Sequence, residues 1–154
     1  FHYGRWHYCP EYRWVWVPDL VWAPAWVTWR VTPDYCGWAP LPPRVQVEVE
    51  LTLGRDEGGH DFDRRHGLAD HHYTFVPRQR LCERDLRGVA LPRPHVARVY
   101  RDSTAVLHAW RRDGQRLINL GPQAATAGLD RAILNTDCVW FTRRHRLRAM
   151  WRAA

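Results

Sequence analysis

Short runs of alternating apolar and polar residues, separated by prolines, dominate the first forty residues of the chain. The alternation predicts a hairpin with strands at residues 4–8 and 13–17 around a turn that contains Pro10. A second hairpin is predicted with strands at residues 25–31 and 36–39. Period-two alternation places successive side chains on opposite faces of a strand, so each hairpin should present one aromatic face.

The two predicted hairpins are copies of one sequence unit. Trp6 and Trp29 each begin the phrase Trp-x-x-x-Pro-acid-Tyr, which is followed in both copies by x-Trp-x-Pro. The second tryptophan, Trp16 or Trp38, comes one residue earlier in the second copy. We therefore expect one hairpin to carry a β-bulge relative to the other. A third, shorter copy lies between them at Val21-Trp22-Ala23-Pro24.

The rest of the chain predicts more strands and a few helical segments. Residues 45–53 alternate most regularly, with Val45 and Val47 on the apolar face, and are predicted to form a core strand. An Asp113-Gly114 pair between two such runs indicates a tight hairpin. The other expected segments are a polar loop at 54–72, strands at 73–76 and 96–101, helical turns at 79–87, hairpin strands at 105–112 and 115–120, a helix at 123–134, a strand at 138–142 and a basic amphipathic helix at 143–151.

These elements together predict a mainly β protein. Consecutive antiparallel hairpins are expected to form a small barrel or sandwich with one or two short helices. We divide the chain into a Trp/Pro-rich double hairpin at residues 1–43, a β-rich continuation at 44–122 that shares its core, and a helix, last strand and basic tail at 123–154. At 154 residues, the three segments are best treated as one compact domain.

Composition argues against catalysis. The chain contains no lysine, so Schiff-base chemistry and the lysine of phosphate-binding loops are both excluded. Its only serine, Ser103, has no histidine near it in the sequence before His108. We therefore expect a protein that is not an enzyme and that needs no cofactor.

The net charge of +7 is unevenly distributed. Residues 138–154 contain five arginines and no acid, whereas residues 45–63 contain six acids and one arginine. The basic end fits an acidic or apolar protein surface, with anionic lipid headgroups as a second candidate. Nucleic acid is not expected, because the tryptophan-rich half of the chain is not the arginine-rich half.

The cysteines and the hydropathy of the chain indicate the cellular compartment in which the protein is expected. The four cysteines are widely spaced and include no Cys-x-x-Cys pair, so they favour disulfides in an oxidising compartment over a zinc site. Three pairings are possible, and we favour Cys9 with Cys36 and Cys82 with Cys138. No run of eighteen apolar residues is present to span a bilayer. These features predict an exported protein that is extrinsic to the membrane.

The string Tyr35-Cys36-Gly37-Trp38-Ala39-Pro40-Leu41-Pro42-Pro43, together with residues 22–30 and 73–77, resembles the bacterial Tyr/Trp/Pro-rich envelope proteins of the YXWGXW-repeat type. Those proteins form an uncharacterised family, number sixty-six hundred among domains of unknown function. The resemblance extends from about Tyr3 to Pro122. It implies export to the periplasm or outer envelope and supplies no catalytic residues. The four cysteines and the lack of a long low-complexity tail depart from the family pattern.

The predicted polar loop holds the one metal-like group of residues in the sequence. Imidazole and carboxylate side chains suit zinc or a harder divalent ion. Their spacing matches no named motif, so an ordinary solvated loop without a bound metal is the favoured interpretation, and these residues are only weak candidates for ligands. The candidate ligands are His60, Asp63, His66, His71 and His72, accompanied by Asp61 and Asp70.

Seven tryptophans within about forty residues exceed what one small core needs, so some are expected at an interface. The leading hypothesis is a non-enzymatic accessory subunit that packs on a larger membrane-associated protein complex. Two alternatives remain: a cell-envelope glycan-binding module and a metal-dependent hydrolase. The predicted interaction residues are Trp14, Trp16, Trp22, Trp26, Trp29, Trp38, Arg143, Arg144, Arg146, Arg148 and Trp151.

Overall fold

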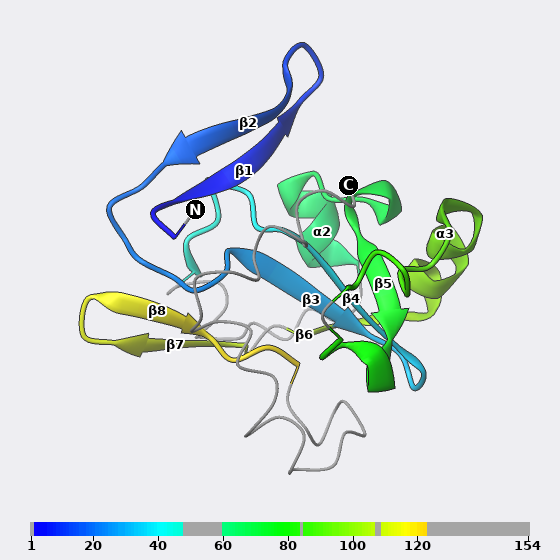
Figure 1. Cartoon of the computed structure of the whole chain (residues 1–154). Coiled ribbons are helices and arrows are strands. Elements are labelled where there is room, and N and C mark those ends of the chain that lie inside the picture. Colours follow the sequence, from blue (N-terminus) through cyan, green and yellow to red (C-terminus); the bar gives the residue numbers. More distant parts are fainter. Residues whose placement is uncertain (1, 48–59, 84, 107–108, 123–154) are drawn as a thin grey trace.

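The structure is a computed structural model that describes residues 2–47, 60–83, 85–106 and 109–122. Within these residues the chain forms eight β-strands, two α-helices and two short 3-10 helices, so it is mainly β, as predicted (Figure 1). The described strands pair as antiparallel hairpins and sheets that close no barrel. The elements are β1 (Gly4–Cys9), β2 (Arg13–Pro18), β3 (Val27–Val31), β4 (Tyr35–Pro40), α2 (Asp61–His66), η1 (Asp70–His72), β5 (Thr74–Pro77), η2 (Arg78–Arg80), α3 (Arg93–Asp102), β6 (Thr104–Val106), β7 (Trp110–Asp113) and β8 (Arg116–Asn119).

A four-stranded sheet of order β5-β4-β3-β6 forms the centre of the molecule. All five residues of β3 are buried, because other elements cover both faces of the sheet. On one face the β7–β8 hairpin contacts Trp29, whose Nε1 donates to Oδ1 of Asn119 at 2.9 Å. On the other face Arg30 reaches α2, where its guanidinium contacts Asp63. Figure 1 shows the β7–β8 hairpin and the helices on different sides of this sheet.

Asn119 fixes the β7–β8 hairpin to the central sheet. Its Nδ2 donates to the backbone carbonyls of Val27 at 2.9 Å and of Ala25 at 3.3 Å, while its Oδ1 accepts from Trp29. Because the side chain is only 2 % exposed, these bonds satisfy polar groups that water does not reach. A single buried amide therefore sets the position of β8 against β3.

The two copies of the repeated unit fold into two hairpins, as predicted. Trp6 is the cross-strand partner of Trp16 in β1–β2, and Trp29 is the partner of Trp38 in β3–β4. The predicted bulge is wrong, since both ladders are regular. The connecting turns absorb the difference of one residue. Three residues separate Cys9 from Arg13 in the first hairpin, whereas in the second the Thr32 N–H donates to the Tyr35 carbonyl at 2.9 Å and leaves a turn of two residues.

The glycine of the Tyr-Cys-Gly-Trp string has a packing role. Gly37 is paired with Phe75 across β4 and β5, and the aromatic ring lies directly over the glycine. A Cβ at position 37 would fall far inside the contact distance of that ring. Glycine at this point lets the fully buried Phe75 lie flat against the central sheet.

Helix α3 replaces the strand that was predicted at residues 96–101. Val96, Val99 and Tyr100 recur with the helical spacing, and all three pack in the core cluster beneath the sheet. Pro94 lies in the first turn of the helix, where its missing N–H costs nothing. The prediction failed because it followed the β-propensity of valine and tyrosine and overlooked their i, i+3, i+4 spacing.

Three other predicted segments need correction. The described part of the expected loop, residues 60–72, contains α2 and η1. Residues 45–47 form no strand, although Val45 and Val47 are buried. Residues 79–87 contain, where described, the end of the 3-10 helix η2 and turns. The segments predicted at 123–134, 138–142 and 143–151, and the remainder of the strand predicted at 45–53 beyond Val47, lie outside the described residues.

The predicted disulfide between Cys9 and Cys36 is wrong, because both cysteines are free thiols. Cys9 ends β1 in the first hairpin, and its Sγ donates to Oε2 of Glu11 at 2.8 Å. Cys36 belongs to β4 in a different sheet and is 1 % exposed. The pair Cys82–Cys138 stays a prediction, since Cys138 lies outside the described residues.

Candidate interaction site

The first hairpin carries its aromatic residues as cross-strand pairs. The rings of Trp6 and Trp16 lie 5.4 Å apart at an interplanar angle of 65°, and those of Tyr8 and Trp14 lie 5.4 Å apart at 70°. Edge-to-face packing of this kind is favourable and holds both partners in place. All four side chains are half-buried. The pairs therefore give the hairpin a stiff aromatic face.

This aromatic face lies against the histidine-rich segment that follows α2. The ring of His72 lies 5.8 Å from that of Tyr8 and 6.1 Å from that of Trp14. A cleft of about 230 Å³ separates the hairpin from this segment. Its lining includes Trp6, Tyr8, Trp14, Pro40, His66 and His72.

His72 is uncharged at neutral pH in this setting. Partial burial, reinforced by neighbouring His71, lowers its pKa, and the carboxylates of Asp63 and Asp70 oppose the shift only in part. The backbone N–H of Ala69 donates to Nδ1 of His72 at 3.0 Å, which requires that this nitrogen carry no proton. The interface between the hairpin and the body therefore depends on a neutral imidazole.

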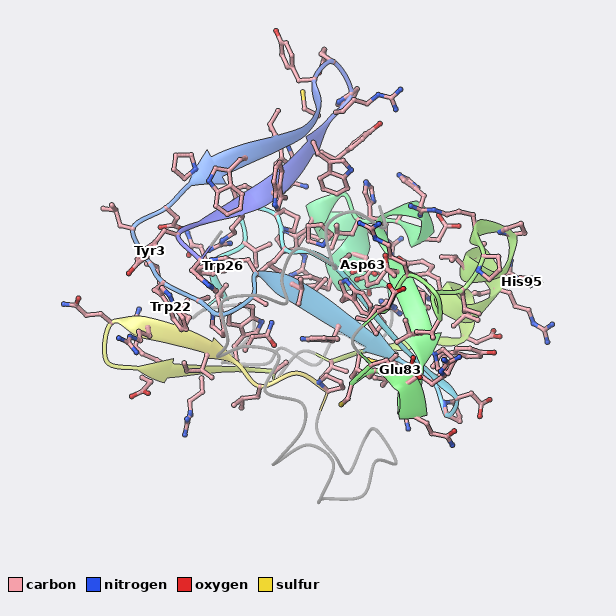
Figure 2. The ribbon with its side chains drawn as sticks, in the orientation of Figure 1. Tyr3, Trp22, Trp26, Asp63, Glu83 and His95 are labelled. Atoms are coloured by element: carbon pink, nitrogen blue, oxygen red, sulfur yellow. The ribbon has the colours of Figure 1, made fainter. Side chains whose placement is uncertain are left out.

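Exposed apolar side chains are concentrated on the same hairpin and on the residues that flank it. Among the described residues, four of the five exposed large hydrophobic side chains belong to residues 3–20, and the fifth is Leu120 at 46 % exposure. Tyr12 stands at the tip of the hairpin, and Tyr3 lies at the rim of the molecule in Figure 2. The four are Tyr3 at 58 %, Tyr12 at 78 %, Val17 at 36 % and Leu20 at 95 %.

Arg5 fastens the hairpin to the body. Its Nη1 donates to the backbone carbonyl of Pro42 at 3.0 Å and to that of Val45 at 2.7 Å. Its guanidinium also lies 4.2 Å from the centre of the Trp26 ring. One side chain thus connects β1 with Trp26, the residue before β3, and with the chain that leaves β4.

The six predicted interaction tryptophans in the described residues divide into two groups. Trp26, Trp29 and Trp38 are at most 4 % exposed and belong to the main core cluster, so their assignment to an interface is corrected. They are core residues because the central sheet is covered on both faces. The other three, Trp14, Trp16 and Trp22, are half-buried, and Trp22 packs against His2 and Arg116.

Exposed arginines lie on the β7–β8 hairpin. Arg111, Arg112 and Arg116 are all exposed, and Asp113 is the acidic residue of these two strands. In the described part of the molecule, Arg111, Arg112 and Arg116 form a basic ribbon next to Trp22. The remaining predicted interaction residues, Arg143, Arg144, Arg146, Arg148 and Trp151, lie outside the described residues.

A buried ion pair joins the central sheet to α2. Nη1 of Arg30 donates to Oδ2 of Asp63 at 2.8 Å, and both side chains are fully buried. Tyr73 donates to Oδ1 of Asp63 and Tyr100 to Oδ2, each at 2.8 Å. Arg30 also donates through Nε and Nη2 to Ser103. Figure 2 shows Asp63 near the centre of the molecule.

The same contacts give the weak metal-ligand candidates Asp63 and His60 structural partners. Both oxygens of Asp63 accept hydrogen bonds from Arg30 and the two tyrosines, so this carboxylate completes a structural network. His60 packs on Tyr100, with 4.6 Å between the rings. No group of three histidine, cysteine, aspartate or glutamate side chains in the described ranges could hold a metal ion.

The carboxylate of Asp63 also affects the two tyrosines that donate to it. Burial raises the pKa of Tyr73, and the charge of Asp63 and the hydrogen bond to it raise that pKa further. The same causes, in the same order, raise the pKa of Tyr100. Both phenols stay protonated as donors and stabilise the negative charge that faces Arg30.

The residues that sequence reasoning missed are those of this network and Arg5. One signal was present: Arg30 lies within the apolar run of β3, where an arginine needs a buried partner. The sequence did not indicate that partner, because Asp63 lies in a stretch that was predicted to be solvated. The role of Tyr100 was hidden by the incorrect strand at residues 96–101.

Comparison with known proteins adds one finding. The model of a family described as "Family of unknown function (DUF6600)" matches residues 1–45, which contain β1 to β4. This agrees with the expected resemblance over that stretch, while its extension to Pro122 stays a prediction. No curated protein and no solved structure matches the chain. In the described part of the chain, no helix combines the length and apolar character needed to cross a bilayer.

Proposed function

We propose that this protein is a non-enzymatic accessory subunit that binds a larger membrane-associated assembly through its first hairpin. The observation that carries the proposal is the concentration of exposed apolar side chains on residues 3–20. Single exposed apolar residues are ordinary on a monomer, but their concentration on one projecting element and its flanks is typical of an interface. Tyrosine at the tip is suited to this role, because it combines a large apolar surface with a polar group.

The basic ribbon on β7–β8 supplies the second part of the contact. Arg111 and Arg116 are exposed, and guanidinium groups are effective at protein interfaces because they bind carboxylates and stack on aromatic rings. An acidic or apolar protein surface, or anionic lipid headgroups beside it, would complement this charge. The partner we propose is therefore a membrane-associated protein complex with an acidic rim around an apolar centre.

The location we propose is the periplasm or outer envelope. Two observations support this location. The family model of unknown function matches residues 1–45, and the Tyr/Trp/Pro-rich stretch resembles envelope proteins. Disulfide bonding supports this compartment less than the sequence suggested, because Cys9 and Cys36 are free thiols.

Ring geometry favours this function over the glycan-binding alternative. A sugar-binding platform needs several aromatic rings in one plane along an open groove. The pairs on the first hairpin stand at 65° and 70°, and Trp14 stands at 84° to His72. The two rings of each pair therefore support one another and do not lie in one plane.

Purification of tagged full-length protein from its native source, followed by membrane fractionation and native gel electrophoresis, tests the proposal. We expect the wild-type chain to sediment with membranes and to migrate with a larger complex. The variants Tyr12→Ser and Leu20→Ser should weaken this association at least about ten-fold, since anchors at interface centres contribute most of the binding energy. Leu120→Ser is the matched control and should behave as wild type, because Leu120 is exposed but lies outside the hairpin.

Two results would overturn the proposal. One is a wild-type chain that stays monomeric and free of membranes at native abundance. The other is equal loss of association in Leu120→Ser and in the two hairpin variants. Retention on a peptidoglycan column, abolished by Trp14→Ala with no protein partner present, would favour the glycan-binding alternative instead.

A further inference from the structure

A surface at the base of the first hairpin brings together apolar and basic side chains from two distant segments of the chain. Trp22 forms a parallel β-bridge with Arg116 of β8, and its carbonyl accepts from the N–H of Leu117 at 3.0 Å. The carbonyl of Tyr3 accepts from the N–H of Asp19 at 3.1 Å, which places Tyr3 beside the same segment. Figure 2 shows Tyr3 and Trp22 at the same edge of the molecule as the β7–β8 hairpin. We call this surface the basal patch, and its residues are Tyr3, Leu20, Trp22, Arg111, Arg116 and Ile118.

The β7–β8 hairpin contributes the basic part of the basal patch. Arg111 is paired with Ile118 across the strands and Asp113 with Arg116, so these four side chains share one face of the hairpin. Both arginines are exposed and Ile118 is half-buried, whereas Leu117 on the opposite face is buried. The face that carries the two guanidinium groups is therefore open to a partner.

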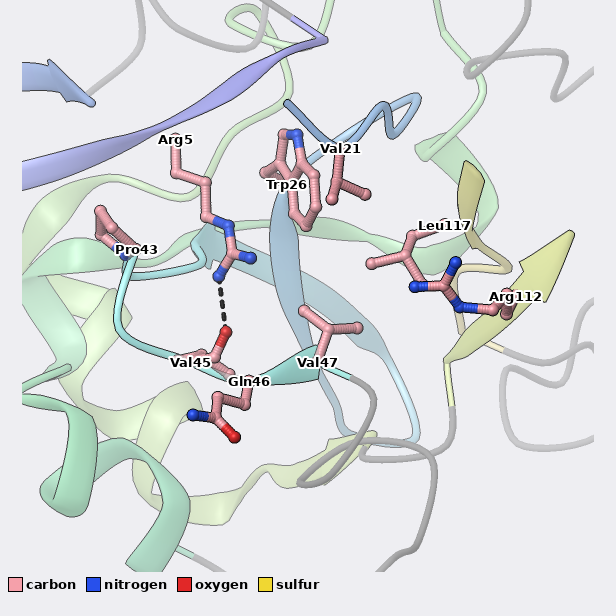
Figure 3. A pocket seen from close by; sticks show the side chains of 9 residues that line it. All are labelled: Arg5, Val21, Trp26, Pro43, Val45, Gln46, Val47, Arg112 and Leu117. Carbon is pink, nitrogen blue, oxygen red and sulfur yellow. Dashed lines mark hydrogen bonds between the residues drawn. The ribbon is translucent and has the colours of Figure 1, made fainter. Parts of the chain in front are cut away.

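The segment beside β8 contributes the apolar part. Leu20 is 95 % exposed, and its N–H donates to Oδ1 of Asp19 in the turn that presents it. Val21 instead lines the hollow on the inner side of the hairpin (Figure 3). Trp22 is half-buried, and the guanidinium of Arg116 lies 5.4 Å from the centre of its ring. An exposed leucine, an indole and a guanidinium are thus neighbours on one accessible surface.

The charge of the basal patch is positive. Arg111 and Arg116 share their face with one carboxylate, that of Asp113. The carboxylate of Asp19 is compensated from the other side, since its Oδ2 lies 3.8 Å from Nη2 of Arg5. A partner that is anionic at its surface would complement this arrangement.

We propose that the basal patch binds the surface of an anionic lipid bilayer. Leu20 enters the boundary between headgroups and acyl chains, while Tyr3 and Trp22 lie at the headgroup level, where amphipathic rings are favoured. The two guanidinium groups bind lipid phosphates. A bilayer suits this surface better than a folded protein does, because a protein would need a pocket shaped for the projecting leucine, whereas a bilayer accepts any projecting apolar side chain.

This inference rests on the proposed function for its setting at a membrane, and it adds a second partner. The tip of the first hairpin, with Tyr12, contacts the protein complex, and the basal patch contacts the lipid beside that complex. Figure 1 shows the tip of the β1–β2 hairpin far from the β7–β8 hairpin, so the two contacts use different surfaces.

Sedimentation of the purified full-length protein with lipid vesicles, with no other protein present, tests the inference. We expect binding to mixed vesicles of phosphatidylglycerol and phosphatidylcholine. Vesicles of phosphatidylcholine alone should bind at least about ten-fold more weakly, because each arginine near an anionic surface strengthens binding about five-fold. Salt at about 0.5 M should weaken the binding, since it screens exposed charges. Equal binding to the two kinds of vesicle, or binding to neither, would overturn the proposal.

Paired arginine variants locate the contact. Arg111→Gln/Arg116→Gln should weaken binding to the anionic vesicles at least about ten-fold. Arg98→Gln/Arg101→Gln removes the same charge from exposed positions of α3 and should weaken it less than about two-fold. Equal losses in the two double variants would show a general attraction between a basic protein and an anionic surface, which contradicts a contact through the basal patch.

Two exposed apolar positions separate this inference from the proposed function. Leu20→Ser should weaken vesicle binding several-fold, because it removes the inserted side chain. Tyr12→Ser should bind vesicles as the wild type does, although we expect it to lose the protein complex. Unchanged vesicle binding in Leu20→Ser would contradict insertion. Binding to soluble polyglutamate but not to anionic vesicles would replace the lipid with an acidic protein partner and overturn the proposal.

Discussion

Nη1 of Arg30 lies 2.8 Å from Oδ2 of Asp63, and both side chains are completely shielded from solvent. This contact connects the middle strand of the central sheet with α2. Tyr73 and Tyr100 donate to the same carboxylate, so each charge has several partners. Such a pair stabilises the fold only while it is complete, because a single buried charge is costly.

Asp63→Asn should lower the free energy of unfolding by about 3 to 5 kcal/mol, since it removes the carboxylate charge that balances the buried guanidinium of Arg30. Urea denaturation followed by tryptophan fluorescence measures the change. Asp61→Asn is the control on the same helix, where the carboxylate pairs with exposed Arg64, and it should cost less than about 1 kcal/mol.

The double variant Arg30→Met/Asp63→Leu completes this test. Apolar residues of similar size remove both charges together, so stability should recover in part, and the remaining loss reflects the Tyr73 and Tyr100 hydroxyls that no longer have Asp63 as acceptor. If Asp63→Asn proved no more destabilising than Asp61→Asn, the buried ion pair would not be a main source of stability.

His72 should make the stability depend on pH. Its pKa is lower in the folded protein than in the unfolded chain, so the unfolded chain binds more protons as the pH falls below about 6.5. The contribution is fully present above that value and is lost on acidification, by at most about 1.4 kcal/mol per pH unit. Urea denaturation between pH 7.5 and 5 measures it.

His72→Phe should reduce this loss of stability, because phenylalanine can occupy the place between Tyr8 and Trp14 without titrating. His95→Gln, a change at an exposed histidine of α3, should retain the wild-type dependence. If the free energy of unfolding changed with pH to the same extent in the wild type, His72→Phe and His95→Gln, groups other than His72 would cause the pH dependence.

Gly37→Ala should destabilise the protein by about 1 to 3 kcal/mol, since the new methyl group would overlap the ring of Phe75 inside a packed core. The midpoint of thermal unfolding is a suitable measurement. Gly88→Ala provides the comparison, because the nearest atom to its added Cβ is 3.7 Å away. Equal midpoints for the two variants would show that the sheet relaxes freely at position 37.

The two free thiols should differ sharply in reactivity. Cys36 is fully buried, and burial raises its pKa to about 12, so almost none of it is thiolate at pH 8. Cys9 is half-exposed at the hairpin. Iodoacetamide followed by peptide mass spectrometry should find Cys9 modified within minutes and Cys36 only after unfolding. Recovery of a Cys9–Cys36 disulfide from native protein would refute the free-thiol state of both residues.

Periodicity identified the elements whose contacts are local. The hairpins β1–β2 and β3–β4 and the turn of β7–β8 followed from alternation and turn residues, because a hairpin is determined mainly by neighbours in the sequence. The single strand predicted at residues 105–112 was wrong, since these residues include parts of β6 and β7, which belong to different sheets. The α3 segment was misassigned, since three apolar residues in a short window fit both a strand and a helix. Its helical state follows from packing of Val96 and Tyr100 under the central sheet.

The sites were harder to predict than the hairpins. The surplus of tryptophan correctly indicated that some indoles remain outside the core, but it did not say which ones. Trp14 and Trp38 belong to the two copies of the repeated hairpin, yet Trp38 is buried and Trp14 is half-exposed. The difference arises because β7–β8 covers the second hairpin, while the first projects from the body.

By itself, the sequence determined the mainly β class, the duplicated hairpins with their paired tryptophans, and the excess of positive charge. These properties depend on local periodicity and on composition. Only the tertiary structure decided that Arg30 meets Asp63, that Cys9 and Cys36 lie in different sheets, and that Trp22 lies beside Arg116. Each of these relationships joins residues far apart in the sequence, and the packing of whole elements brings them together.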